Sequence, residues 1–307
     1  MRRVAVLWFT LLLTSCSVVD STPAAAVDAS SLPPLTSREQ SLIYGADGAA
    51  QQGNIAAAER DYMSAVSIST GHIEAHLALA RLYEQQKEPA KERAILERAL
   101  VFQPNHALAN YLFGKIELDA NRFAEAREAF TRGLTTQPDN VDLVVGQAVA
   151  DDMLGNHEKA QGTYSRILRA NPKASLAGLR TNLAMSYLLS GAPKKAVELL
   201  QAEAKKPNAS SVTRHNLALA YGLLGRNAEA KKLLDGEIDE ETRLLTVARL
   251  KEYIKERAAG ATPNVPTINV DRDVSAPVRS KKPAAKPSTP AVSSAPPTLD
   301  KTVDATP

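Results

Sequence analysis

The chain has 307 residues, a formal net charge of +3 and a single cysteine, Cys16. One cysteine excludes a disulfide within the chain. A nearly balanced charge provides no electrostatic footprint for nucleic acid or for an anionic lipid surface. We therefore expect no nucleic-acid partner.

The N-terminus has the organisation of a secretory signal. Two arginines precede a largely apolar run, residues 4–13, and the sequence Leu-Thr-Ser-Cys then ends at Cys16. The run is too short for an ordinary membrane span. Its ending resembles a bacterial lipobox, in which the cysteine is lipidated and becomes the mature N-terminus. We predict a lipoprotein signal peptide at 1–15; the alternative is an ordinary signal with a chance cysteine, or an uncleaved anchor.

The predicted lipid also gives an expected location. Ser17, not aspartate, follows Cys16, and by the habit of bacterial lipoproteins this favours the outer membrane, with the protein facing the periplasm. Several acyl chains make a stable anchor, because each buried methylene contributes roughly 0.8 kcal/mol. The expected contact with the membrane is therefore made through the N-terminal lipid.

Composition divides the rest of the chain. Residues 16–38 are small and polar and predict a lipidated N-terminus with a flexible tether. Residues 39–238 carry the repeats described below. Residues 239–258 predict one amphipathic helix that caps the array. Residues 259–307 hold nine of the 18 prolines and predict a disordered tail rich in Pro, Ala, Ser and Lys.

A regular sequence period runs through the middle of the chain. Pro104, Pro138 and Pro172 are 34 residues apart, and glycine or asparagine recurs at one turn of nearly every unit. A fixed period of this length indicates stacked helical hairpins. The units begin near Glu39, Ile73, Ala107, Val141, Ala177 and Ser211. The sequence therefore predicts an all-α superhelical solenoid of about six helix-turn-helix repeats with a C-terminal capping helix and disordered ends.

The pattern within each unit resembles the tetratricopeptide repeat (TPR). Position 8, where two helices cross closely, is always small: Ala46, Ala80, Gly114, Ala148, Ala184 and Ala218. Position 24, which fills the space between helices, is Tyr62, Leu96, Phe130, Tyr164, Leu200 and Leu234. Small residues let helices approach and bulky ones fill the gap. The second unit departs from the pattern, with Pro89 at the turn and Glu92 at the small position 20. Two extra residues near 173–176 lengthen one loop, which is either a hinge or simply a longer loop.

The resemblance implies a binding groove, because the first helix of each TPR unit lines the concave face. Its groove positions hold Leu77, Arg81, Leu108, Tyr111, Lys115, Leu118, Val145, Val149, Asp152, Met185, Leu188, His215 and Leu219. This set is more apolar than a solvated surface. We expect it to hold a segment of a partner protein. The alternative is that individual side chains of the set pack against neighbouring helices.

Catalytic and metal signatures do not appear in the sequence. There is no phosphate loop, paired-histidine motif or nucleophile elbow, and the five histidines are scattered. Asp151 and Asp152 are expected on a solvated helix face. We predict no metal site, no cofactor, no small-molecule substrate and no enzymatic activity.

The sequence of the last repeat units resembles one particular group of TPR proteins. The stretch 214–226, RHNLALAYGLLGR, resembles the signature of TadD-like proteins, and residues 181–191 echo it. Those are the TPR lipoproteins of the tight-adherence (Flp) pilus machinery. The resemblance implies a role in assembling or localising the outer-membrane secretin pore, with a secretin or pilus-assembly subunit as partner. The alternative is a TPR lipoprotein adaptor for outer-membrane protein insertion or for cell-wall enzymes.

Overall fold

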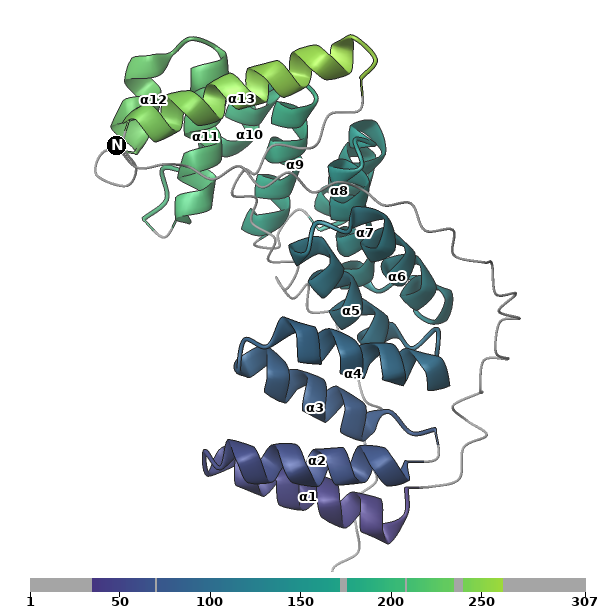
Figure 1. Cartoon of the computed structure of the whole chain (residues 1–307). Helices are drawn as coiled ribbons and strands as arrows, with labels where there is room; N and C mark the ends of the chain where they lie inside the picture. The colour runs from purple at the N-terminus through teal and green to yellow at the C-terminus, as the bar shows by residue number, and fades with distance from the viewer. Residues whose placement is uncertain (1–34, 70, 172–175, 208, 235–239, 262–307) are drawn as a thin grey trace, which may run out of the picture.

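The described part of the chain is a row of helical hairpins followed by one long helix. The computed structural model describes residues 35–261 except 70, 172–175, 208 and 235–239. These residues form thirteen helices, and no strand occurs among them (Figure 1). The bounds are Ser37–Gln51 (α1), Ile55–Ile68 (α2), Glu74–Gln85 (α3), Pro89–Phe102 (α4), Ala107–Asp119 (α5), Phe123–Thr136 (α6), Val141–Met153 (α7), His157–Ala170 (α8), Ala177–Leu189 (α9), Pro193–Leu200 (α10), Ser211–Leu223 (α11), Asn227–Leu233 (α12) and Glu240–Ala258 (α13).

The first twelve helices pair in order into six hairpins. Each helix from α1 to α11 contacts the next one along the chain. The small residues at position 8 are completely or almost completely buried, as expected for helices that cross closely. The all-α repeat solenoid predicted from the 34-residue period is therefore confirmed.

The array begins with a well-formed helix cap. The Thr36 hydroxyl accepts a hydrogen bond from the backbone N–H of Glu39 at 3.2 Å, and the Glu39 carboxylate accepts one from the Thr36 N–H at 2.8 Å. This reciprocal pair is a capping box, which satisfies two otherwise unpaired donors at a helix N-terminus. The first described helix, α1, thus begins directly after Thr36, and the predicted repeat boundary at residue 39 falls in its first turn.

The hairpin turns need a left-handed residue, and the second unit obtains it without glycine. Gly53, Gly155, Gly191 and Gly225 all have φ between 76° and 81°. In the second unit Lys87 has φ 57°. Pro89 then begins α4, at a helix position where its missing N–H costs nothing. The departures noted in this unit therefore leave the hairpin intact.

Helix α13 exists as predicted but does not continue the stack. It contacts α11 and α9. Figure 1 shows it running back across the ends of these helices toward α8. Its buried stripe is narrow: Val247, Leu250 and Tyr253 are buried, whereas Leu244 and Leu245 are 45% and 50% exposed.

Several predictions fall on residues outside the described part. These are the signal peptide, Cys16 and nearly all of the tether, the tail from residue 262 onward, and most of the extra loop at 172–175. Among the helices that the structure does describe, none has the length and apolar character needed to cross a bilayer.

Candidate binding surface

The predicted groove residues divide into an accessible group and a buried group. Arg81 is exposed, and Leu108, Tyr111, Lys115 and His215 are half-buried. The buried members are Leu77, Leu118, Val145, Val149, Asp152, Met185, Leu188 and Leu219. The apolar members of this second group belong to the hydrophobic clusters of the array. In this conformation they pack against other helices, as the alternative interpretation expects, and a ligand contact for them stays a prediction.

The accessible group is concentrated on two neighbouring helices. Leu108, Tyr111 and Lys115 are spaced i, i+3 and i+7 along α5 and therefore share one face of that helix. Arg81 occupies the corresponding face position on α3. The Lys115 ammonium lies 3.4 Å from a Glu84 carboxylate oxygen and 5.8 Å from the centre of the Tyr111 ring. We call Arg81, Leu108, Tyr111 and Lys115 the α3–α5 surface.

The α3–α5 surface mixes charge with apolar area. Tyr111 and Leu108 supply apolar contacts, and Arg81 and Lys115 supply donors. Tyrosine and arginine are the side chains that most often anchor protein interfaces. This composition suits a protein segment better than a small apolar ligand.

In the C-terminal half, α13 packs against α9 and α11, the helices that carry predicted groove residues. Val247, Leu250 and Tyr253 of α13 join the same hydrophobic cluster as Met185 and Leu219. The array makes room for this helix at Gly222, where an added Cβ would lie 2.6 Å from Val247 Cγ2. The sequence predicted the helix but not that it would pack against Gly222 and the helices α9 and α11.

Asp152 is the centre of a buried polar network, which corrects the prediction that Asp151 and Asp152 lie on a solvated face. Both side chains are buried, at 1% and 3% exposure. Asp152 Oδ1 accepts a hydrogen bond from Ser186 Oγ at 2.7 Å and lies 2.8 Å from His157 Nδ1. Burial raises the pKa of the Asp152 carboxyl despite these hydrogen bonds. The two aspartates are buried because partners on other turns and helices compensate them.

The network reaches from the array to α13. His157 Nε2 lies 3.2 Å from the Tyr253 hydroxyl, which comes from a residue 96 positions later. Tyr253 is 3% exposed. Asp152, His157 and Tyr253 therefore tie the fourth hairpin to the final helix. Spacing could not have revealed this link, since Tyr253 is so far from the other two in sequence.

The residue types of a hydrolytic triad meet here, but their connectivity is different. In such a triad the histidine bridges the serine and the carboxylate. Here Ser186 and His157 both bond to Asp152, and the second nitrogen of His157 faces Tyr253. The serine is bonded to the carboxylate and not to the histidine, so the connectivity differs from that of a triad, and the contacts join α7, α8, α9 and α13.

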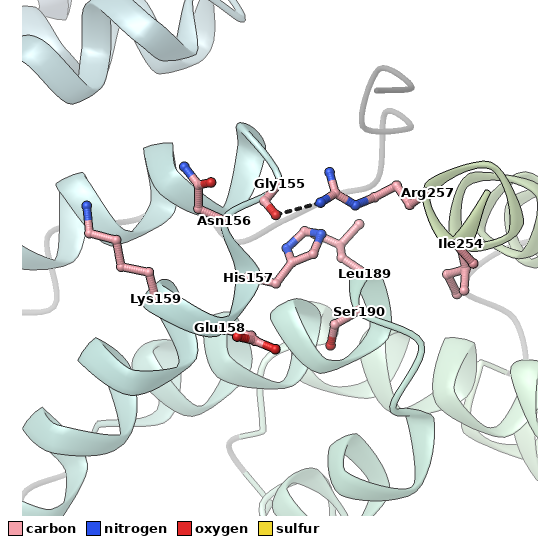
Figure 2. A pocket seen from close by; sticks show the side chains of 10 residues that line it. Gly155, Asn156, His157, Glu158, Lys159, Leu189, Ser190, Ile254 and Arg257 are labelled. Carbon is pink, nitrogen blue, oxygen red and sulfur yellow. Dashed lines mark hydrogen bonds between the residues drawn. The ribbon is translucent and has the colours of Figure 1, made fainter. Parts of the chain in front are cut away.

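A pocket of about 580 Å³ lies beside this network, between the α7–α8 turn, the end of α9 and the end of α13. Figure 2 shows Arg257 reaching from α13 to the backbone carbonyl of Gly155, at 2.8 Å. Lys159 on the same rim pairs with Asp151 at 2.8 Å. The basic side chains of the rim, Arg257 and Lys159, are thus used in contacts within the protein. Among the described residues, no group of three or more potential ligands could hold a metal ion.

The geometry defines a class of protein: a helical-repeat solenoid, the kind of scaffold that binds other proteins along its surface. A tetratricopeptide-repeat family model matches residues 49–116 and 117–183. The hairpins on either side carry the same small and bulky positions, with two extra residues before the fifth unit, and the described array has the fold of a TPR solenoid.

Solved structures support the same fold. A tetratricopeptide repeat protein from Parabacteroides merdae superposes with a TM-score of 0.51 at 19% identity, covering 71% of this chain and 83% of its own. PilW, described as a widely conserved type IV pilus biogenesis factor, superposes with a TM-score of 0.55 at 18% identity, covering 69% of this chain and 99% of PilW. The search of curated protein sequences gave no significant match.

Most of the 214–226 signature has a structural role in the sixth hairpin. Its central residues 217–220 are buried, and Gly225 provides the left-handed turn. The Arg226 guanidinium lies 4.4 Å from the centre of the Tyr221 ring and pairs with Glu229. Asn216 is different, because its buried side-chain amide has no hydrogen-bond partner within the described structure. Repeat packing therefore accounts for much of the motif but not for Asn216.

Proposed function

We propose that this protein is a non-enzymatic TPR scaffold, held at the outer membrane by lipid on Cys16, that helps to assemble or localise a Flp/tight-adherence pilus secretion pore. The observation that carries the proposal is the 214–226 stretch, similar to the TadD signature, placed within a TPR array behind a lipobox-like N-terminus. PilW, itself a pilus biogenesis factor, has a similar fold. That likeness supports the fold and makes the pilus role a natural hypothesis.

The mechanism follows from the parts of the chain. Lipid at Cys16 would hold the protein at the membrane, and residues 17–38 would give it reach. The α3–α5 surface would then capture a segment of a secretin or pilus-assembly subunit. Tethering raises the effective concentration of the captured subunit near the membrane, so even a moderate intrinsic affinity is sufficient.

Removing the lipidation site should release the protein from the outer membrane. We expect Cys16→Ala to abolish labelling by radioactive palmitate and to move the protein out of the outer-membrane fraction on a sucrose gradient. Ser17→Ala is the matched control and should leave the lipid label in place. An unchanged label and fractionation in Cys16→Ala would contradict the lipid anchor.

A capture experiment tests the partner. The full chain should recover a secretin or pilus-assembly subunit from solubilised membranes, and the variant Arg81→Ala/Tyr111→Ala/Lys115→Ala should lose this recovery. These positions are accessible, so the triple variant should keep its helical circular dichroism. The matched control changes two exposed residues on second-helix positions, Met63→Ser and Val101→Ser, which are 41% and 69% exposed.

Equal recovery by the native chain and the triple variant would remove the α3–α5 surface from the mechanism. Recovery of insertion-machinery or cell-wall proteins instead would replace the pilus role with an adaptor role.

A further inference from the structure

Helix α13 meets the array through one face only. Val247, Leu250 and Tyr253 are spaced i, i+3 and i+6, and all are buried against the array. Ile254 adds a half-buried contact at i+7. Leu244 and Leu245 are exposed, and so are most of the other side chains of α13 whose burial the structure describes. This is how an amphipathic helix lies in a groove, and it differs from the two-sided packing of a helix inside a repeat array.

The array carries a glycine where α13 packs against α11. Gly222 lies in the last turn of α11. An added Cβ there would meet Val247 Cγ2 at 2.6 Å. Position 12 is larger in every other unit: Ala50, Glu84, Leu118, Asp152 and Leu188. The sixth hairpin thus has no side chain at the position where Val247 of α13 packs against it.

The far end of α13 is fixed by polar contacts of a different kind. Tyr253 reaches His157, and Arg257 donates to the Gly155 carbonyl. At the turn between them, a Cβ on Gly191 would lie 3.0 Å from Ile254 Cγ2. The contacts of α13 therefore extend from α11 past the end of α9 to the α7–α8 turn. The pairing of α1 to α12 is made by those helices themselves.

From this arrangement we propose that the surface beneath α13 is a second partner-binding surface that accepts an amphipathic helix of a partner protein, with α13 as its internal occupant and competitor. The partner helix would carry bulky apolar residues at i, i+3, i+6 and i+7 and an arginine at i+10. Those are the spacings of Val247, Leu250, Tyr253, Ile254 and Arg257. The proposal builds on the scaffold role above by stating what kind of partner the C-terminal half receives.

Competition sets how the surface behaves. A helix attached to the same chain acts at an effective concentration in the millimolar range. An incoming helix of similar sequence therefore binds weakly until α13 is released, because its apparent affinity is reduced by the fraction of molecules that are open. Weakening α13 without changing the surface should expose the site.

The experiment uses the full-length chain in detergent and a fluorescein-labelled peptide of residues 240–258 as the probe. Peptide binding is measured by fluorescence anisotropy. The variant Leu250→Asp/Tyr253→Ala should bind the peptide at least about tenfold more tightly than the native chain. The control Leu244→Asp/Leu245→Asp changes exposed positions and should behave as the native chain does. Adding Gly222→Ala to the opened variant should abolish binding, because the new methyl group occupies the space of Val247.

Three results would overturn the proposal. The first is an opened variant that keeps its helical circular dichroism and does not bind the peptide. The second is loss of the whole array in that variant, which would make α13 an obligatory part of the fold. The third comes from amide hydrogen exchange of the native chain: we expect α13 to exchange faster than α9 and α11, and equal protection would show that α13 opens only on global unfolding.

This test is independent of the pilus role. It contains no pilus subunit, so failure of peptide binding leaves capture at the α3–α5 surface unaffected. Conversely, failure to capture a secretin would leave the exchange of α13 measurable as before.

Discussion

Replacing Phe130 with alanine should lower the free energy of unfolding by about 3–5 kcal/mol, the usual range for a fully buried aromatic residue. Phe130 is 0% exposed and comes from α6, and its ring lies against α5 on one side and α7 on the other. An added Cβ at Gly114 or at Gly146 would lie 2.6 Å from the ring. Two glycines on adjacent first helices therefore enclose one aromatic ring, and its removal opens a cavity between two repeats.

The enclosing glycines give the complementary measurement. Gly146→Ala gains about 1 kcal/mol of helix propensity, but overpacking against the ring costs about 1–3 kcal/mol. We expect net destabilisation, relieved when Phe130→Leu is added. Urea unfolding followed by circular dichroism measures both effects. Gly162→Ala in α8 is the matched control, since a Cβ there meets nothing within 4 Å; it should be neutral or stabilising. If Gly146→Ala behaves like Gly162→Ala, the ring is not enclosed as described.

The repeat architecture was predictable because it depends on local and periodic features. Small residues at position 8, bulky residues at position 24 and left-handed turn residues recur at fixed spacing, and each has the same role in every hairpin. The position of Phe130 in the core follows from this pattern. The left-handed turn at Lys87 did not follow, because in this unit the hairpin contacts impose the turn geometry on a residue that does not favour it.

The binding surface was only partly predictable, for a different reason. Apolar side chains at groove positions, such as Met185 and Leu219, satisfy two patterns at once, since they can line a groove or pack beneath another helix. The sequence pattern of α13 shows that it has an apolar stripe but not which surface the stripe covers. One sequence feature pointed to the surface that α13 covers: Gly222 is the one glycine at position 12 of the repeat units. The sequence did not indicate that Asp152 is buried, because the hydrogen-bond network around it includes a tyrosine from α13, far along the chain.

The combined contribution of Glu92 and His76 to the stability of the native chain should change little between about pH 4.5 and 6.5, because these two buried groups in one hairpin titrate with opposite effects. Burial, with the nearby charge of Glu84, raises the pKa of Glu92 to about 7. Burial, with the nearby charge of Arg98, lowers the pKa of His76 to about 4. The folded state therefore holds a proton on Glu92 that the unfolded state releases above its ordinary value of 4.5. In the folded state His76 also stays neutral at pH values where the unfolded state binds a proton on it, which it does below its ordinary pKa of 6.5.

The sign of each effect follows from which state binds more protons. Through Glu92 the folded state binds more, so stability falls as pH rises from about 4.5 to 7. Through His76 the unfolded state binds more, so stability rises as pH rises from about 4 to 6.5. Each contribution is about 2–3 kcal/mol, and they nearly cancel where the two windows overlap. Both residues belong to the α3–α4 hairpin, so both act on the opening of the same unit.

Single substitutions should reveal how each group alone makes the free energy of unfolding depend on pH. Glu92→Gln removes the falling contribution, and we expect its stability to rise by about 2 kcal/mol between pH 4.5 and 6.5. His76→Leu should show the opposite trend, with stability falling over the same range. Urea unfolding at a series of pH values, combined with hydrogen exchange of the α3 and α4 amides, measures both. The double variant should follow the pH profile of the native chain in this range. A Glu92→Gln profile that matches the native one would mean that Glu92 ionises normally in the folded state, and the cancellation would then be wrong.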